Sequence, residues 1–275
     1  MVFNRDGFEN FLFQQFPFLR ASPLPLYVFD ALASTNQTLW QLLEGGSNCP
    51  AAAIAAQQTA GRGQWGRQWQ SSPGGLYLSL ALAPNLSASE SFHLTLCSAY
   101  GIASQLRRHG VPVALKWPND LLLEGRKLGG IKIETRIQAS IIARAIIGIG
   151  INWHNPVPQV GINLQSFPQI DSLEQLAAIA IGGTLSTYQQ YQRDGIEPIL
   201  ASYVSVLDSL GQKISVDGCP GTIVGVESTG KLQIRLHSEG ASTEICQDTG
   251  TISLWPGTIS LGYDDSNVAR TPHAQ

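Results

Sequence analysis

Two long β segments follow each other directly between residues 129 and 152, and they constrain the fold more than any other feature. Residues 129–137 read GGIKIETRI and residues 139–152 read ASIIARAIIGIGIN. Both segments are rich in isoleucine, and the chain can turn only near Gln138 and Ala139, so we predict two paired strands with a tight connection. The sheet is then at least partly antiparallel, and we predict the α+β class with a mixed, largely antiparallel sheet.

Helices and further strands are expected on both sides of this pair. Leu76, Leu78, Leu80 and Leu82 alternate with other residues, which predicts a strand with one apolar face. Apolar periodicity, N-cap residues and terminal glycines predict the other elements. We expect helices over residues 34–46, 89–106, 171–181 and 196–210, and strands over residues 51–57 and 111–117.

The texture of the chain changes after residue 210. Five short β segments follow, which read QKISV, GTIVGVE, LQIRLH, TEICQ and TISLW. Clusters of glycine, serine and aspartate separate them, as in a small barrel. We therefore predict a domain boundary near residue 210, a β domain over residues 211–263 and a disordered tail over residues 264–275.

Charge is scarce in this chain. Charged residues make up 13%, against about 25% in typical soluble domains. The net charge of -3 argues against general electrostatic binding to nucleic acid or to anionic membranes. The four cysteines and five histidines show no ligand spacing, so we expect free thiols and no zinc site. No signal peptide or long apolar run is evident, and we expect a cytoplasmic protein.

A glycine-rich segment, residues 57–69, reads QQTAGRGQWGRQW. Gly61, Gly63 and Gly66 have the spacing of a dinucleotide-binding turn, but Pro73 and two glycines follow and exclude the helix that such a turn must open. A Walker A loop is excluded too, because no G-K-[ST] follows. What remains is a loop whose arginines and backbone amides suit an anion and whose tryptophans could cover a ligand. The alternative is a surface turn with solvated arginines.

A second polar cluster occupies residues 116–130. Lys116 and Asp120 flank Pro118 at a junction between strand and turn, where polar side chains can project together. Lys127 precedes two glycines at the start of a strand, and glycine in a strand usually means that a ligand or another backbone lies close. The alternative is an ordinary turn followed by a solvent-exposed lysine.

Together these segments resemble the biotin protein ligase family, whose members join biotin to the carrier lysine of biotin-dependent carboxylases. The matching segments are STN at 34–36, QTAGRG and GRQW within 58–69, KWPND at 116–120, KLGGI at 127–131 and GIGIN at 148–152. They occur in the family's order, and the resemblance extends over roughly residues 27 to 262.

The resemblance implies a catalytic domain related to class II aminoacyl-tRNA synthetases and lipoate ligases, over residues 1–210 with a Phe-rich extension over residues 1–26. An SH3-like barrel would follow over residues 211–263. The implied substrates are biotin and ATP, with Mg²⁺. The implied reaction forms biotinyl-5'-AMP and then biotinylates a lysine of the biotin carboxyl carrier protein of acetyl-CoA carboxylase.

The resemblance also implies site residues. Arg62 and Lys127 are the expected catalytic residues, which position the carboxylate and the α-phosphate. The expected biotin-binding residues are Ser34, Thr35, Asn36, Gln58, Gly61, Arg62, Gly63, Gln64, Lys127 and Gly130. The expected ATP-binding residues are Arg62, Arg67, Trp69, Lys116, Asp120, Lys127 and Asn152. Asp120 is also the expected metal-site residue. Simple N-capping remains an alternative role for Ser34 and Thr35, and an Asx turn remains one for Asp120.

Two positions depart from the family pattern. Gln64 stands where many members have a basic residue, so we expect faster leakage of the adenylate. Lys132 stands where an aliphatic residue is common, which puts a charge in the expected apolar lining. Only 33 residues precede Ser34, too few for the helix-turn-helix of some members. We expect a monofunctional ligase, monomeric or homodimeric, without nucleic-acid or membrane partners. The rivals are a lipoate or octanoate ligase and an inactive biotin-binding module.

Overall fold

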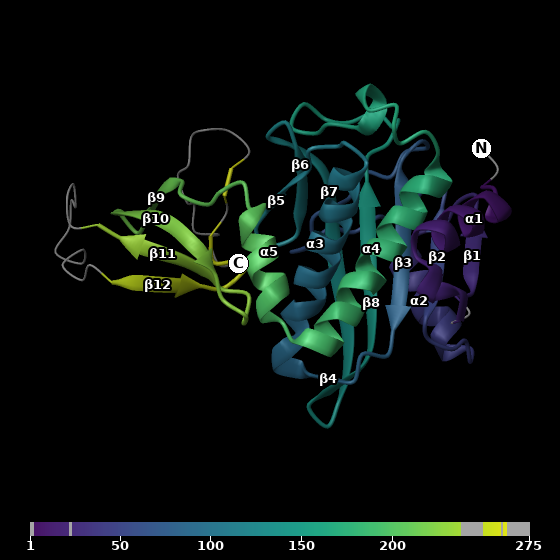
Figure 1. The fold of residues 1–275 in the computed structure, drawn as a ribbon, viewed down its shortest axis with the longest axis horizontal. Helices are drawn as coiled ribbons and strands as arrows, with labels where there is room; N and C mark the ends of the chain where they lie inside the picture. Colours follow the sequence, from purple (N-terminus) through teal and green to yellow (C-terminus); the bar gives the residue numbers. More distant parts are fainter. Residues whose placement is uncertain (1–2, 22–23, 238–249, 260, 263–275) are drawn as a thin grey trace.

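The structure is a computed structural model that describes residues 3–21, 24–237, 250–259 and 261–262. It contains an eight-stranded sheet with the strand order β1-β2-β3-β8-β7-β6-β5, to which β4 adds by pairing with β8 (Figure 1). The pair β1 and β2 is parallel, and the other neighbours are antiparallel. The predicted class, α+β with a mixed and largely antiparallel sheet, is confirmed.

Most of the predicted elements are present, but the helix predicted over residues 171–181 extends to Asp194, and the helix Arg5–Gln15 and the strand Leu26–Phe29 have no counterpart among the predictions. The strands of the large sheet are β1 (Leu26–Phe29), β2 (Ala51–Ala55), β3 (Leu76–Leu82), β4 (Leu86–Ser87), β5 (Ala114–Lys116), β6 (Asp120–Leu123), β7 (Arg126–Gln138) and β8 (Ile141–Ile151). The helices are α1 (Arg5–Gln15), α2 (Thr35–Glu44), α3 (Ser91–Arg108), α4 (Leu173–Asp194) and α5 (Glu197–Ser205). The smaller sheet holds β9 (Lys213–Val216), β10 (Cys219–Val226), β11 (Leu232–Leu236) and β12 (Thr251–Leu254).

Strand β3 shows how the layers are arranged. Its leucines, including Leu76 and Leu78, belong to the core beneath α3 and α4, whereas Ala81 packs with Leu39 of α2 on the opposite face. All of its residues are buried, because helices cover both faces. The predicted strand is therefore confirmed, but its second face is also buried. Figure 1 shows α3 and α4 in front of the central strands.

The β7–β8 hairpin confirms the strand pair that the sequence predicts. Ala139 and Ser140 form its turn with φ values of 48° and 66°. Two successive positive φ values are those of a type I′ turn, whose twist matches that of paired strands. The register places Gly130 opposite Gly150 and Lys132 opposite Gly148. These four positions share one face of the sheet, because side chains alternate along a strand.

The helix predicted over residues 196–210 is shorter than expected. Helix α5 ends at Ser205, because the following backbone bonds to β5 instead of continuing the helix. Leu115 N donates to Val206 O at 2.8 Å, and Asp208 N donates to Leu115 O at 2.8 Å. These tertiary hydrogen bonds replace the last helical turn although the apolar spacing persists.

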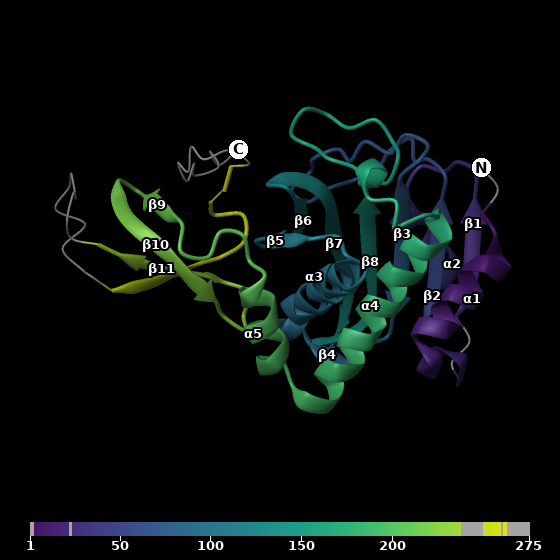
Figure 2. The same cartoon turned by 45° about the horizontal axis from the view of Figure 1, so that its top comes forward.

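The four-stranded antiparallel sheet lies beside α5 and the β5 edge of the large sheet, as Figures 1 and 2 both show. Trp117 Nε1 donates to Gly230 O at 2.9 Å and joins the two parts. The TEICQ segment and the predicted tail lie outside the described residues. The domain boundary near residue 210 and the SH3-like barrel stay predictions. Cys219 is disulfide-bonded, so the expectation of free thiols is wrong for this residue.

Candidate functional site

A cavity of about 500 Å³ opens on the face of the large sheet that α2 partly covers. Few side chains cover the floor of the cavity, because three of its residues are glycines on that face of β7 and β8. They are Gly130, Gly148 and Gly150. A methyl group at Gly148 would collide with Asn36 Oδ1, and one at Gly150 would lie 2.5 Å from Trp69 Nε1. The glycines therefore give the neighbouring polar side chains room at the sheet surface.

The structure brings the predicted site residues together at this cavity. All of them except Gly61 line it, although they come from five separated segments of the sequence. At Gly61 an added Cβ would lie 2.5 Å from Trp69 O, so its contribution is close backbone packing within the loop. The individual roles assigned from sequence stay predictions.

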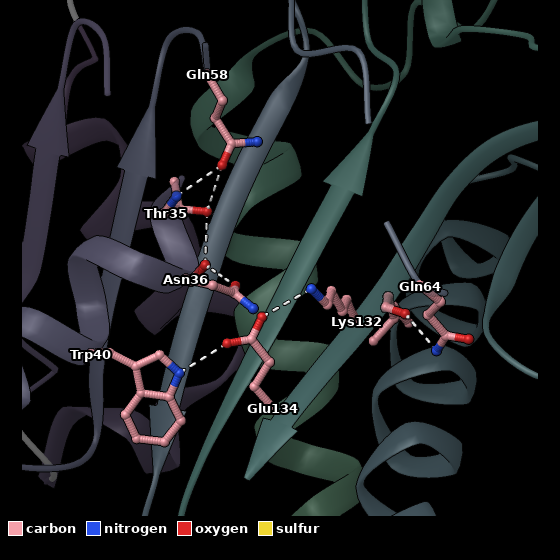
Figure 3. Close-up of polar contacts among 9 residues, drawn as sticks. Thr35, Asn36, Trp40, Gln58, Gln64, Lys132 and Glu134 are labelled. Carbon is pink, nitrogen blue, oxygen red and sulfur yellow. Dashed lines mark hydrogen bonds and ion pairs between the residues drawn. The ribbon is translucent and has the colours of Figure 1, made fainter. Parts of the chain in front are cut away.

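One end of the cavity, here called the amide end, is formed by Ser34, Thr35, Asn36 and Gln58. Thr35 N donates to Gln58 Oε1 at 2.8 Å, and Thr35 Oγ1 donates to the same oxygen at 3.1 Å. Beneath them Ser79 Oγ lies 2.7 Å from Thr35 Oγ1 and 2.6 Å from Asn36 Oδ1. These bonds hold the side-chain amides in fixed orientations (Figure 3).

The alternative role of Ser34 and Thr35 is simple N-capping of α2, and the hydrogen bonds of their side chains bear on it. Ser34 occupies the N-cap position of α2, but its side chain makes no cap hydrogen bond. Its side chain is nevertheless buried and lines the cavity. Thr35 uses its hydroxyl on Gln58. The N-terminus of α2, which carries the partial positive charge of the helix dipole, also lies at this end of the cavity.

The other end, here called the cationic end, is built on the β5–β6 hairpin and the start of β7. The register pairs Lys116 with Asp120, and Asp120 with Gly130. Lys127 Nζ contacts Asp120 Oδ1 at 2.7 Å. Asp120 therefore contacts one ammonium group and interacts electrostatically with a second, that of Lys116, and the summed charge of the three groups is positive. Such a site suits an anion.

Lys116 has an unusual environment. Burial lowers its pKa to about 8, and the neighbouring charges of Lys127 and Arg67 lower it as well, while Asp120 opposes them. Its Nζ donates to Gly262 O at 2.6 Å. The group is therefore close to its titration range at physiological pH, unlike an exposed lysine.

The glycine-rich loop is a short hairpin over the cavity. Gly63 N donates to Arg67 O at 2.7 Å, and Arg67 N donates to Gln64 O at 3.1 Å. Trp65 and Gly66 adopt φ values of 56° and 73°, which again indicate a type I′ turn. Gln64 Nε2 bonds to Ile131 O of β7 at 3.4 Å. No helix follows the loop, as the sequence predicts.

The two arginines of this hairpin, Arg62 and Arg67, are exposed and line the cavity. In the part of the chain that the structure describes, neither forms an ion pair. Trp69 lies deeper, and the Lys127 Nζ is 5.5 Å from the centroid of its ring. Its indole N–H is buried and has no hydrogen-bond partner among the described residues. These groups leave positive charge and one donor beside the cavity.

Asn152, the last predicted residue, supports the cationic end from below. Its Nδ2 donates to Ile162 O at 3.1 Å and lies 3.4 Å from Lys127 O, while Asn155 Nδ2 donates to Asn152 Oδ1 at 3.0 Å. These bonds fix the backbone that carries Lys127. Contact of Asn152 with a nucleotide stays a prediction.

The described residues include no group of three or more His, Cys, Asp or Glu side chains that could hold a metal ion. Mg²⁺ needs fewer protein ligands, since one or two carboxylates and the phosphates of a nucleotide commonly hold it. Asp120 is the carboxylate at the cationic end. Asp120 would be the protein ligand for an ion that arrives on a nucleotide, and its role as a metal-site residue stays a prediction.

Sequence reasoning missed several residues of this site. Ser79, Trp40 and Glu134 fix the amide end, and residues after the smaller sheet also line the cavity, namely Gly257, Ile259, Leu261 and Gly262. Strand alternation could have indicated Glu134, because it faces the same way as Gly130. Nothing local in the sequence indicates the residues after the smaller sheet.

Known proteins match both the sequence and the fold. Residues 28–152 match the model of the Biotin/lipoate A/B protein ligase family. The bifunctional ligase/repressor BirA of Escherichia coli is 30% identical, over 85% of this chain and 73% of its own length. The BirA of Bacillus subtilis is 30% identical over 73% of this chain, which covers 65% of that relative.

A solved structure shows the same fold. The biotin protein ligase from Aquifex aeolicus, in complex with biotin and ATP, has a TM-score of 0.66 and 24% identity. The match covers 84% of this chain and 95% of that one. Within the described residues, we find no helix that combines the length and apolar character that a bilayer crossing requires. With the family model and the Escherichia coli relative in agreement, this chain belongs to the biotin protein ligase family.

Proposed function

We propose that this protein is an ATP-dependent biotin protein ligase that modifies a lysine of the biotin carboxyl carrier protein of acetyl-CoA carboxylase. The observation that carries the proposal is the single cavity that joins the amide end to the cationic end. A fixed set of hydrogen-bonding amides suits the cyclic urea of biotin, and grouped cations suit its carboxylate and the phosphates of ATP.

In the first step a carboxylate oxygen of biotin attacks the α-phosphorus of ATP. The bond from that phosphorus to the bridging oxygen breaks, and pyrophosphate leaves. Two anions must approach each other, so we assign Arg62 and Lys127 to offset their charge. Asp120 holds the Lys127 ammonium at 2.7 Å, which fixes its position at the cavity wall. Mg²⁺ would enter on the nucleotide phosphates and supply further charge compensation.

In the second step the neutral amine of the carrier lysine attacks the acyl carbon of the adenylate. The bond from that carbon to the phosphate oxygen breaks, AMP leaves with the electron pair, and the amine loses a proton. The adenylate hydrolyses readily, so the site must exclude water. The hairpin over residues 61–69 borders the cavity, and we assign this protective role to it.

The test uses purified protein, ATP, Mg²⁺, labelled biotin and an isolated carboxyl-carrier domain. We expect label on the carrier lysine and none on a matched carrier in which that lysine is replaced by arginine. Folded protein that leaves the carrier unlabelled contradicts the proposal. Titration calorimetry separates the inactive-module alternative, because only a ligase converts bound biotin into a much more tightly held adenylate when ATP is added.

We also propose that the protein acts in the cytoplasm. Its proposed substrates, ATP and the carrier protein of a carboxylase, support this location. Fractionation of cells that express a tagged protein tests it. We expect the tag in the fraction that contains acetyl-CoA carboxylase, and its recovery elsewhere contradicts the location.

A further inference from the structure

The amide end contains an ion pair on the floor of the cavity. Lys132 Nζ lies 3.1 Å from Glu134 Oε1, and their side chains are 26% and 31% exposed (Figure 3). Both line the cavity, on the same face of β7 as Gly130. Lys132 is opposite Gly148, which has no side chain to shield it. A ligand that fills this end therefore meets the pair directly.

The Glu134 carboxylate is held in place from several sides. Trp40 Nε1 donates to Glu134 Oε2 at 2.9 Å. Burial alone would raise the pKa of Glu134, but hydrogen bonds from Trp40, Asn36 and Lys132 outweigh it, so this pKa lies below its usual value. The carboxylate is therefore ionised at neutral pH, and the lysine keeps its charged partner.

The pair is also connected to the amides of the cavity. Glu134 accepts from Asn36, whose Oδ1 lies 2.6 Å from Ser79 Oγ. Ser79 Oγ is in turn 2.7 Å from Thr35 Oγ1, which bonds to Gln58. A series of polar contacts thus connects the ion pair to Gln58. Ser79 and Thr35 carry one hydroxyl hydrogen each, so two of the three contacts between Asn36 and Gln58 are hydrogen bonds at any one time. The Glu134 carboxylate can only accept hydrogen bonds. The Asn36 amide therefore presents its nitrogen to Glu134 and its oxygen to Ser79.

We propose that the Lys132–Glu134 pair is a specificity determinant that excludes a plain alkanoyl chain from the amide end and admits a small polar ring such as a cyclic urea. The inference rests on the proposed function and deepens it. An alkyl chain against the pair removes water from two charges and returns no hydrogen bond. A cyclic urea offers one carbonyl acceptor and two N–H donors, which replace the lost water.

The test compares two acids in one enzyme. Adenylation of biotin and of octanoate is followed by pyrophosphate release, and kcat/KM is measured for each. In the wild type we expect a strong preference for biotin. In the double variant Lys132→Leu, Glu134→Gln the ratio of octanoate to biotin should rise about 10-fold or more, as expected when a pocket wall changes from charged to neutral. Because both acids are measured on the same preparation, partial misfolding cancels from the ratio.

Two further variants sharpen the result. Glu134→Gln alone leaves the Lys132 ammonium without its carboxylate, so kcat/KM for biotin should fall while octanoate stays excluded. Arg193→Leu removes a different ion pair, between Arg193 and Asp194 on the exposed surface of α4, and should leave the ratio unchanged.

The outcomes separate the two proposals. If the wild type adenylates biotin but the double variant keeps the wild-type ratio, the specificity inference is overturned and the ligase function stands. If the folded wild type adenylates neither acid, the proposed function fails and the inference fails with it. If the wild type prefers octanoate, both are overturned in favour of an alkanoyl ligase.

Discussion

The amide end and the cationic end of the cavity hold their polar groups in different ways. Thr35 and Asn36 are at most 6% exposed and belong to a series of polar contacts within the protein. Arg62 and Arg67, by contrast, are exposed and carry charges beside the cavity. Neighbours thus fix the amides of the first end, whereas the second end combines two lysines that neighbours hold with two exposed arginines that form no ion pair among the described residues.

We expect the amide end to determine which ligand binds and the cationic end to determine how fast the reaction proceeds. A site of fixed donors and acceptors discriminates strongly, because a wrong ligand leaves buried groups unpaired. Grouped cations act on any anion of suitable shape, and they matter most where charge develops during the reaction. Variants at the two ends should therefore affect different kinetic constants.

The largest effect is expected at Lys127. Replacement by methionine removes the ammonium that Asp120 holds at 2.7 Å beside the cavity, so the rate of adenylate formation should fall about 100-fold or more. Pyrophosphate release in single turnovers measures it. Lys127→Arg, which keeps the charge, is the matched control and should lose less. A near-normal rate in the methionine variant would remove Lys127 from the mechanism.

A smaller and different effect is expected at Gln58. Replacement by alanine leaves the Thr35 N–H and hydroxyl without their acceptor. We expect the affinity for biotin to fall about 10-fold, while the KM for ATP changes little. Calorimetry with biotin alone measures the first quantity, and steady-state kinetics measures the second. Equal losses for both substrates would show that the two ends are not independent.

The pH dependence of ATP use should identify Lys116. Because burial lowers its pKa to about 8 in the free protein, its charge is lost between pH 7 and pH 9. The kcat/KM for ATP should fall about 10-fold over that range. Lys116→Arg keeps its charge and should flatten the profile. An unchanged slope in this variant assigns the titration to another group.

The same residue affects stability in the opposite direction. The pKa of Lys116 is lower in the folded chain than in the unfolded one, so the unfolded chain binds more protons between about pH 8 and pH 10. The contribution of Lys116 to the free energy of unfolding should therefore increase with pH in that range. Urea titrations of the wild type and Lys116→Met at pH 8 and pH 10 measure the difference.

The smallest effect is expected at Arg67. Its side chain is exposed, and an exposed ion pair with a phosphate contributes about 0.2 to 1 kcal/mol. Arg67→Gln should raise the KM for ATP about 3-fold and leave the affinity for biotin unchanged. The effect should shrink further at high salt. A loss as large as that at Lys127 would mean that the hairpin closes over the nucleotide and buries this charge.

Local patterns carried most of the fold. Isoleucine-rich segments and a short junction predicted the β7–β8 hairpin, and apolar periodicity predicted α3 and the first half of α4. Tertiary contacts set what the patterns missed. Hydrogen bonds to Leu115 shorten α5, and Cys219 is disulfide-bonded although no cysteine spacing indicated it. Such contacts depend on which segments meet in space, and one sequence does not show that.

Local motifs predicted one part of the candidate site, and the other part depends on tertiary contacts. Glycines and charged residues in short motifs predicted the two ends, and the structure gathers them at one cavity. Ser79 looked like an ordinary residue of an apolar strand, and its position under Asn36 depends on the pairing of β3 with β8. The ion pair at Lys132 required knowing which face of β7 borders the cavity. The sequence thus predicted most of the polar residues of the site, and the register of the sheet determined which other side chains lie beside them.

The bond from Lys116 to the Gly262 carbonyl spans 146 positions of the chain. During synthesis the lysine emerges from the ribosome long before its acceptor does. Gly257, Ile259 and Leu261 of the same late segment also line the cavity. The pocket therefore acquires its complete wall only after Gly262 has left the ribosome.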